Sequence, residues 1–378
     1  MVYSKSFVYQ TGIVYKVLKT SFPLQRLRFM SLETSPKKRR LNMKIGTHNG
    51  TFHCDDALAV WMLKQTKEFG NAEVIRTRTP KKLDECDIVV DVGAVFDHAE
   101  RRYDHHQREF KETYNSLDPS KPWTTKLSSA GLVYVYYGKE IIKNLMERNG
   151  VSGDKLSDEL VGIIADKVYA NLIEEIDAVD NGISQTDGTT RYKVTTTISQ
   201  RVANLNPFWN AEISDEIMMK RFERAMELVG AEMMDRVSYY QLSWLPGRTL
   251  VQDALEKRYQ VHESGEIISF PQTGIPWKEH MLALEEELGV SVPVKYVLYE
   301  DATNKRWRVQ CVPVRSDSFE NRLSLPADWC GVRDNELSEL TGIPGCVFVH
   351  ANGFIGGNET YQGVLKMATE SLRIATQN

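Results

Sequence analysis

The chain has 378 residues, of which 42% are hydrophobic and 26% charged, a composition typical of soluble globular proteins and a length sufficient for two domains. No apolar run approaches the roughly 20 residues that a membrane helix needs, and five widely spaced cysteines do not form the pattern of a disulfide framework. The first 44 residues hold ten Lys or Arg and one acid, so the rest of the chain, with 37 basic and 50 acidic side chains, is acidic. This charge argues against a broad basic face, and we expect neither a membrane nor a stable duplex DNA partner.

The first segment in chain order is a basic leader, residues 1–42. Its first 32 residues carry five basic and no acidic side chains, which is the composition of a mitochondrial transit peptide; a disordered tail is the alternative. Directly after comes "SPKKRRLN", a basic run of the nuclear-localisation type. We therefore expect a targeting leader outside the fold, and a location in the mitochondrial matrix and the nucleus.

Residues 43–210 have the pattern of a domain with a parallel sheet. Short apolar runs at 43–48, 72–78 and 86–93 predict buried strands, and the segments 55–69 and 128–147 predict helices between and after them. The segment 155–182 predicts the longest helix of this domain, because apolar residues recur every four positions and Asn181-Gly182 provides a left-handed cap. The apolar positions are Leu156, Leu160, Ile164, Val168, Leu172 and Ile176.

The rest of the chain predicts a helical connector at 211–244 and a smaller α/β domain at 245–378. Two strands at 292–300 and 306–314, separated by "DATNK", have the pattern of a hairpin. A strand at 346–350, a loop at 351–358 and a helix at 359–373 follow near the C-terminus. We therefore predict an α/β protein whose second domain binds substrate.

Side chains that can hold metal ions gather at predicted strand and helix ends in the first domain. They are His48, His53, Asp55, Asp56, Asp91, Asp104, His105, His106, Asp177 and Asp180. Ligands of open α/β sheets collect at the carboxyl ends of the strands, so these segments are expected to meet in one crevice. Mixed imidazole and carboxylate groups suit Mn²⁺, Zn²⁺ or Fe²⁺ better than Ca²⁺. Each residue taken singly has a structural alternative, such as a turn cap or a solvated helix face.

The order of these groups is also familiar. An upstream His…Asp segment, a strand-end Asp, the triplet "DHH" at 104–106 and a later Asp resemble the DHH phosphoesterase superfamily. That resemblance implies two divalent ions, usually manganese, that hydrolyse phosphoester or phosphoanhydride bonds. The segments "GTHNGTFHCDDALAVWMLK", "VVDVGAVFDHAERRYDHHQ", "LNPFWN" and "GIPGCVFVHANGFIGGN" resemble one group more closely, the melanocyte proliferating gene exonuclease family. Its members are described as metal-dependent 3′-to-5′ RNA exonucleases of the nucleus and mitochondrion.

The resemblance assigns roles position by position. The first superfamily motif is usually His-x-x-x-Asp-x-Asp, and His48 matches its histidine with a loop one residue longer. Its first aspartate then falls on His53 and its second on Asp55, with Asp56 as the alternative. This departure leaves open the number of ligands at one ion. Asp91 matches the second motif, and the resemblance implies that it bridges both ions.

The triplet and a later aspartate complete the implied site. His105 matches the ligand histidine, and its neighbour His106 is expected to touch the substrate phosphate. Asp104 would hold a ring nitrogen and fix the tautomer. The fourth aspartate is Asp177 or Asp180, and we favour Asp177. The predicted catalytic residues are therefore His106 and Asp104, and the predicted metal ligands are His48, His53, Asp55, Asp91, His105 and Asp177.

A second candidate site lies in the glycine-containing segment 350–358. Gly353, Gly356 and Gly357 allow close approach of the backbone to a ligand, and the following helix N-terminus favours a phosphate; an ordinary turn is the alternative. Related superfamily members carry a Gly-Gly loop that grips substrate, although the usual histidine after the glycines is Asn358 here.

Other side chains of the second domain are candidates for substrate contacts. Candidates for phosphate or sugar binding are Arg308, Arg322, Arg333 and His350, and each arginine also suits a surface salt bridge. Trp307 and Trp329 suit base stacking, with core packing as the favoured alternative.

The predicted function is two-metal hydrolysis of a phosphodiester, with two Mn²⁺ ions as the expected cofactor and Mg²⁺ as the alternative. We expect a 3′-to-5′ exonuclease in RNA processing that acts on single-stranded RNA or a short oligonucleotide; the direction and the preference for RNA rest on the resemblance alone. The rival predictions are a phosphatase or pyrophosphatase for small nucleotides and a non-catalytic metal-binding protein.

Overall fold

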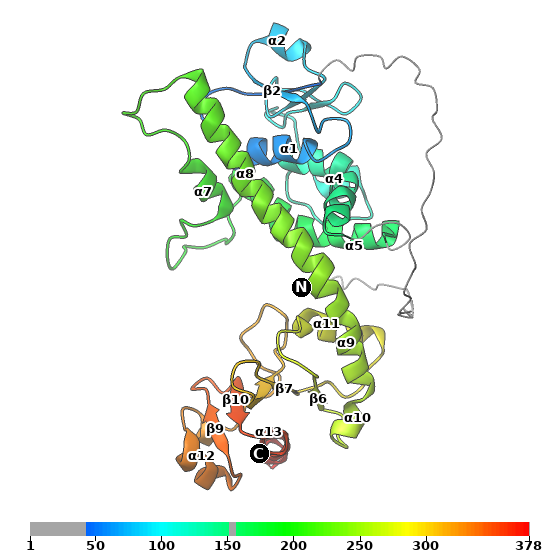
Figure 1. Ribbon diagram of the computed structural model, residues 1–378, viewed down its shortest axis with the longest axis vertical. Helices are drawn as coiled ribbons and strands as arrows, with labels where there is room; N and C mark the ends of the chain where they lie inside the picture. The colour runs from blue at the N-terminus through cyan, green and yellow to red at the C-terminus, as the bar shows by residue number, and fades with distance from the viewer. Residues whose placement is uncertain (1–42, 151–155, 378) are drawn as a thin grey trace, which may run out of the picture. The chain divides into compact units, whose positions relative to one another are not determined.

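The computed structural model describes residues 43–150 and 156–377, and the predicted leader at 1–42 lies outside the described residues. These residues form two compact units, one ending at Gln241 and the other beginning at Leu242. Each unit contains one five-stranded sheet with helices packed against it, which confirms the predicted α/β class (Figure 1). Within the described ranges, no helix is both long enough and apolar enough to cross a membrane.

The first unit alternates short strands with helices. Its elements are β1 (Lys44–Thr47), α1 (Cys54–Leu63), β2 (Glu73–Arg76), α2 (Pro80–Asp84), β3 (Ile88–Val90), β4 (Phe96–Asp97), β5 (Arg102–Tyr103), α3 (Tyr114–Leu117), α4 (Ser129–Arg148), α5 (Asp158–Val168), the π-helical turn η2 (Tyr169–Ile173), α6 (Glu174–Asp180), α7 (Ile198–Ala203) and α8 (Asp215–Tyr239). A second π-helical turn, η3 (Tyr240–Trp244), follows α8 along the chain.

The sheet of the first unit has the strand order β2-β1-β3-β5-β4. The strands β2, β1, β3 and β5 run parallel, and only the short β4 is antiparallel to its neighbour. The central strands read as continuous apolar runs because both faces of the sheet are covered. Since β1, β3 and β5 are adjacent and parallel, the loops after them leave the sheet at the same edge.

Different elements cover the two faces of this sheet. The helix α1 contacts β1 and β3 and also packs against α4 and α8. Leu83 and Cys86 pack with Val89 in a smaller apolar cluster. Gly46 in β1 makes room for that cluster, because a Cβ atom there would lie 3.0 Å from the Cys86 Sγ atom. Strands of three or four residues are therefore held in place by packing on either side.

The long helix predicted at 155–182 is present in altered form. It begins at Asp158 and is interrupted by the π-helical turn η2 between α5 and α6. The apolar residues recur every four positions, whereas an α-helix has 3.6 residues per turn. A π-helical turn has more residues per turn than an α-helix, so the turn at η2 keeps Val168, Leu172 and Ile176 on the buried side. Gly182 ends the segment with φ +67°, as its position after Asn181 predicted.

The second unit begins with helices and ends with a mostly antiparallel sheet. Its elements are α9 (Leu245–Glu256), α10 (Arg258–Val261), β6 (Ile267–Ser269), α11 (Trp277–Glu287), β7 (Tyr296–Glu300), β8 (Trp307–Cys311), the 3₁₀ turn η4 (Ala327–Trp329), α12 (Asp334–Thr341), β9 (Cys346–Val349), β10 (Ile355–Asn358) and α13 (Tyr361–Ala375). The sheet order is β6-β7-β8-β10-β9, and the predicted hairpin is the antiparallel pair β7–β8.

One prediction for this unit is wrong. The segment 351–358 was expected to be a loop, but its last four residues form β10, which pairs with β8 and β9. Gly356 faces the core, where a Cβ atom would lie 3.0 Å from the Leu325 Cδ1 atom and 3.1 Å from the Met367 Cε atom. These glycines therefore permit close packing of a central strand, a role that the local sequence does not distinguish from a turn.

The packing of α1 on α8 gives a stability prediction. A Cβ atom on Gly230 in α8 would lie 2.1 Å from the Trp61 Nε1 atom of α1. We expect Gly230→Ala to lower the free energy of unfolding by about 1–3 kcal/mol, because one helix or the indole ring must move. The matched control is Gly162→Ala in α5, where no atom lies within 4 Å of the added Cβ; it should raise stability by about 0.5–1 kcal/mol. Urea unfolding curves measure both, and equal effects would contradict the packing described.

Candidate metal centre

Four chain segments deliver acidic and imidazole groups to one place in the first unit. The loop 48–56 follows β1 and enters α1, Asp91 follows β3, the triplet 104–106 follows β5, and Asp180 ends α6. Three of the segments thus lie at the common edge of the parallel strands, as the sequence predicted. The structure brings them together as groups whose ligand atoms lie within 4.8 Å of one another.

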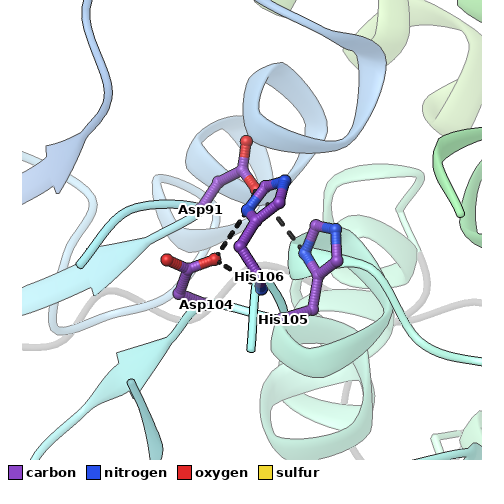
Figure 2. A group of neighbouring side chains, drawn as sticks. All are labelled: Asp91, Asp104, His105 and His106. Carbon is purple, nitrogen blue, oxygen red and sulfur yellow. Dashed lines mark hydrogen bonds and ion pairs between the residues drawn. The ribbon is translucent and has the colours of Figure 1, made fainter. Parts of the chain in front are cut away.

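Asp91 occupies the middle of this cluster. Its φ of +58° lies in the left-handed region, which costs a non-glycine residue on the order of 1–3 kcal/mol. Its backbone N–H donates to the Tyr103 carbonyl at 3.0 Å, so β5 fixes the turn that follows β3. The carboxylate lies 3.5 Å from the His105 Nδ1 atom and 3.4 Å from the His106 Nδ1 atom (Figure 2). A strained backbone thus aims one carboxylate at several neighbours.

His48 lies against two of the carboxylates. Its Nε2 atom is 3.1 Å from Asp56 Oδ2 and 3.2 Å from Asp91 Oδ2, and its Nδ1 atom is 3.2 Å from the Asn49 carbonyl oxygen. Burial alone would lower the pKa of His48, but hydrogen bonding to Asp56 and Asp91 raises it to about 10. Without a cation, the imidazole ring of His48 is therefore protonated at neutral pH. The proton on Nε2 then occupies the position of the lone pair that would hold a metal ion.

Asp55 and Asp56 open the helix α1 and are fully buried. Asp56 Oδ1 accepts the His53 backbone N–H at 2.8 Å, which caps the helix, while Oδ2 faces His48. Asp55 Oδ2 accepts the Ser129 hydroxyl at 2.8 Å. Burial, together with the charges of Asp91 and the other nearby carboxylates, raises the pKa of Asp55 well above its usual range. Asp55 is therefore the carboxylate that most needs a positive charge beside it.

His105 joins the cluster to the end of α6. Its Nε2 atom lies 2.8 Å from Asp180 Oδ2, and its ring is buried. Burial raises the pKa of Asp180, but the hydrogen bond from His105 outweighs it, so the net shift is downward. Asp180 also forms a group with His53 and Asp55.

The cluster has more ligand atoms than hydrogen-bond partners. Among the described residues, buried polar atoms that make no hydrogen bond outside the cluster itself include His48 Nε2, Asp55 Oδ1, Asp56 Oδ2, Asp91 Oδ1, His105 Nδ1 and Asp180 Oδ2. A buried polar atom without a hydrogen-bond partner costs free energy of folding. A concentration of such atoms therefore indicates a site that binds an ion or a ligand. Imidazole nitrogens and carboxylate oxygens at this spacing fit divalent metal ions.

The candidate ligand groups overlap at Asp91. Three of the four groups contain it: one with His48 and His53, one with Asp55 and Asp56, and one with the triplet 104–106. A shared carboxylate is one arrangement that can hold two neighbouring ions, and the bridging role of Asp91 stays a prediction. His53 and His106 are the exposed members of the cluster, so they form its rim.

Asp104 and His106 form a pair beside the cluster. Asp104 Oδ1 accepts hydrogen bonds from the His106 ring nitrogen Nδ1 at 2.8 Å and from the His106 backbone N–H at 3.0 Å (Figure 2). Asp104 Oδ2 accepts the Ala94 N–H at 2.6 Å. These bonds overcome the effect of burial and lower the pKa of Asp104, and the same pairing raises the pKa of His106. The predicted bracing of a histidine by Asp104 therefore falls on His106.

The structure places Asp177, the favoured fourth ligand, outside the cluster. Its Oδ1 atom accepts the Ser128 N–H and hydroxyl and the Gly131 N–H, and Oδ2 accepts the Tyr169 hydroxyl at 3.0 Å. Burial raises the pKa of Asp177 to about 7 despite these bonds. Asp177 thus holds the first turn of α4, and Asp180, one helical turn later, contacts His105. Periodicity could not separate the two, because both fall near the end of the same helix.

Two further residues at this site were not found from the sequence. The Arg78 guanidinium, just beyond β2, bonds the Asn49 carbonyl and lies 3.1 Å from His48 Nδ1. Ser129 at the start of α4 bonds Asp55. The adjacency of β2 and β1 could have pointed to Arg78, but nothing in the local sequence marks Ser129, which depends on how α4 packs on α1.

The candidate residues of the second unit are mostly engaged in structure. Asn358 is buried, donates to the Pro344 carbonyl at 2.9 Å and accepts the Thr360 N–H at 3.0 Å at the start of α13. A Cβ atom on Gly357 would lie 2.8 Å from the Arg308 Nη1 atom. Gly353 occupies a turn with φ +65°.

The aromatic and basic candidates divide into buried and exposed ones. Trp329 lies in the core, and Trp307 packs on it from the edge; Arg322 is held by two bonds to Glu285, at 2.6 and 3.0 Å. Arg308 pairs with an acid and is 12% exposed, whereas Arg333 is 65% exposed and His350 is exposed. Substrate binding by these residues stays a prediction, and Arg333 and His350 are the most accessible of them.

Comparison with known proteins identifies the family. Residues 44–372 match the family model MYG1_exonuc, described as an uncharacterised protein family (UPF0160). The chain belongs to the MYG1 family. The MYG1 exonuclease of Mus musculus is 50% identical over 367 residues, which cover 96% of this chain and 94% of the mouse protein. The MYG1 exonuclease of Homo sapiens is 50% identical over 354 residues, 92% of each chain. A MYG1 protein of Saccharomyces cerevisiae is 41% identical over 355 residues, 89% of this chain and 99% of the yeast protein.

The contacts of the two aspartates give a test of which one holds metal. In this MYG1-family chain, Asp180→Asn should weaken Mn²⁺ binding by more than about tenfold, because it removes a carboxylate from the cluster. Asp177→Asn is the matched control, since an amide can accept from Ser128 and Gly131 and donate to Tyr169. It should leave Mn²⁺ affinity nearly unchanged. Titration of chelator-treated protein with Mn²⁺ measures both variants, and a larger loss with Asp177→Asn would contradict this assignment.

The protonated His48 predicts a pH dependence of metal binding. A histidine with a pKa of about 10 is protonated at pH 7 and must lose that proton before its Nε2 atom holds a cation. Affinity for Mn²⁺ should therefore rise with pH, by about tenfold per unit between pH 6 and 8 if this proton dominates. Calorimetry in buffers of different ionisation enthalpy should detect proton release at pH 7, and His48→Gln should reduce it. Binding without proton release would contradict the described environment of His48.

Proposed function

We propose that this chain is a metal-dependent 3′-to-5′ exonuclease that hydrolyses single-stranded RNA. One observation carries the proposal: buried carboxylates and imidazoles from four segments surround Asp91 with unsatisfied ligand atoms. Relatives that align with nearly the whole chain are named exonucleases, which supports a nuclease over other hydrolases. The strand direction and the choice of RNA are parts of the proposal that rest on resemblance.

The groups of the centre suggest a division of labour. Asp91, together with His48, His53, Asp55, His105 and Asp180, would hold two ions, which we propose to be Mn²⁺. Such ions would supply an activated water and neutralise charge on the phosphate. The remaining steps belong to the protein's own side chains, and above all to those at the exposed rim.

His106 is the side chain best placed to meet the substrate. It is 57% exposed, and the Asp104 carboxylate raises its pKa, which favours the imidazolium form near neutral pH. An imidazolium at the rim can donate a hydrogen bond to a phosphate oxygen and stabilise the charge that develops there. Asp104 keeps Nδ1 engaged, so Nε2 would be the ring nitrogen that donates to the substrate.

The acidic charge of the chain is compatible with this substrate. Net negative charge disfavours nonspecific binding along duplex DNA, whereas cations in the centre would attract a single phosphate group locally. We also propose that the leader at 1–42 directs the protein to the mitochondrial matrix and the nucleus, so that its RNA substrates lie there. That part rests on the composition of the leader alone.

The test is cleavage of a short RNA labelled at its 5′ end, in the presence of Mn²⁺. We expect a ladder of products shortened from the 3′ end, and no release of orthophosphate from pyrophosphate. Asp91→Asn should lower cleavage by at least about 10³-fold, because it removes the shared carboxylate. His106→Ala should lower kcat by about 10²–10⁴-fold with metal content unchanged. Cleavage that survives Asp91→Asn, or orthophosphate released from pyrophosphate, would show that this function is wrong.

A further inference from the structure

Two aromatic side chains stand in solvent in the connection between α7 and α8. Trp209 is 94% exposed and Phe208 is 75% exposed. Isolated apolar residues are common on protein surfaces, but here two adjacent large rings are both exposed, and no described residue of their own unit covers them. We propose that they form a stacking platform for the bases of single-stranded RNA, beside the metal centre. This inference rests on the proposed nuclease function and adds to it a binding site for the strand next to the reacting phosphate.

Leu205 and Asn206, which we call the stem of the platform, are held in place by hydrogen bonds. The Asn206 side chain accepts the Phe52 backbone N–H at 3.1 Å and donates to the Phe52 carbonyl at 2.9 Å. The preceding Leu205 carbonyl accepts the Arg221 guanidinium of α8 at 2.8 Å. Because the stem is bonded on two sides, the exposure of the rings is a feature of the folded loop and does not arise from a loose end.

The stem is bonded to the loop that carries the metal ligands. Phe52 directly precedes His53, which is exposed at the rim of the centre. Phe52 itself is buried and packs edge-on against Phe222 of α8, with ring centroids 5.7 Å apart. Trp209 lies three residues beyond Asn206, a span of at most about 11 Å, so the platform sits within a few nucleotides of the rim.

Charge in the segment that precedes the two rings favours a polyanion. The loop before α7 exposes Arg191, Tyr192 and Lys193 in a row, with Tyr192 77% exposed, and Arg201 of α7 is exposed too. Figure 1 shows α7 and its flanking loops beside α8, which α7 contacts. In a chain that is acidic overall, this stretch combines basic side chains with aromatic rings. Single-strand binding surfaces use that combination: rings for the bases and cations for the backbone.

The experiment compares full-length Phe208→Ala/Trp209→Ala with wild type and with Phe319→Ala. Phe319 is the matched control, because it is fully exposed but lies in the second unit. With Mn²⁺, the double variant should show about tenfold lower kcat/KM on single-stranded RNA, mainly through KM, because each stacked base contributes to binding. Its activity on bis(p-nitrophenyl) phosphate, which has no bases, should equal that of wild type. The Phe319→Ala variant should match wild type on both substrates.

An RNA that lacks bases near its 3′ end separates stacking from other roles. On this abasic RNA, the kcat/KM of wild type should fall to the value that the double variant has on normal RNA. The kcat/KM of the double variant should be the same on both RNAs. Equal kcat/KM of the double variant and wild type on normal RNA would overturn the proposal. So would an equal loss on bis(p-nitrophenyl) phosphate, which would indicate a structural role.

A binding measurement separates failure of the platform from failure of the nuclease function. If wild type cleaves neither substrate, the proposed function is wrong, but fluorescence anisotropy with the same labelled RNA still tests the platform. About tenfold weaker binding by the double variant, with the Phe319→Ala variant unchanged, would support it. Equal RNA affinity of all three proteins would overturn the platform. So would a sedimentation experiment in which the double variant loses a homodimer that wild type forms, if its RNA affinity is unchanged.

Discussion

Repulsion among the buried carboxylates around Asp91 determines the chemistry of the metal centre. Asp55, Asp56 and Asp180 share its neighbourhood, and burial with mutual charge raises the pKa of Asp55 and Asp91. Such a group can be neutralised by protons or by cations. His48 lies between Asp56 and Asp91, and its raised pKa means that a proton offsets part of their charge. Several ligand atoms remain unsatisfied, and divalent ions are the solution that fits them.

The fold creates this neighbourhood by simple means. Parallel strands end at one edge of the sheet, and the left-handed turn at Asp91 aims its carboxylate at groups from the adjacent segments. Asp177, although outside the cluster, supports it indirectly. It holds the N-terminal turn of α4 through Ser128, and the next residue, Ser129, bonds Asp55. A buried carboxylate can therefore position the ligands of a metal centre without touching metal, and an amide at Asp177 can keep that role because it can make the same hydrogen bonds.

Much of this could be predicted from sequence because the signals are local. Apolar runs predicted the strands β1, β2 and β3, and the acidic and imidazole residues at strand ends indicated the metal centre. The choice of Asp180 over Asp177 could not be predicted, since it depends on a π-helical turn and on the packing of α6 against α4. Gly356 and Gly357 read equally well as a ligand loop or as a closely packed strand, and only the pairing of β10 decides between them. The role of Asn206 could not be predicted from the sequence, because its hydrogen-bond partner, Phe52, is 154 residues away along the chain.

We propose that two cations share the Asp91 carboxylate. Crystals of the full chain grown with Mn²⁺, with diffraction recorded at the manganese absorption edge, test it most directly. We expect two anomalous peaks about 3.5–4 Å apart, with the Asp91 carboxylate between them and Asp180, not Asp177, beside one. A single peak, or peaks that lie away from Asp91, would contradict it.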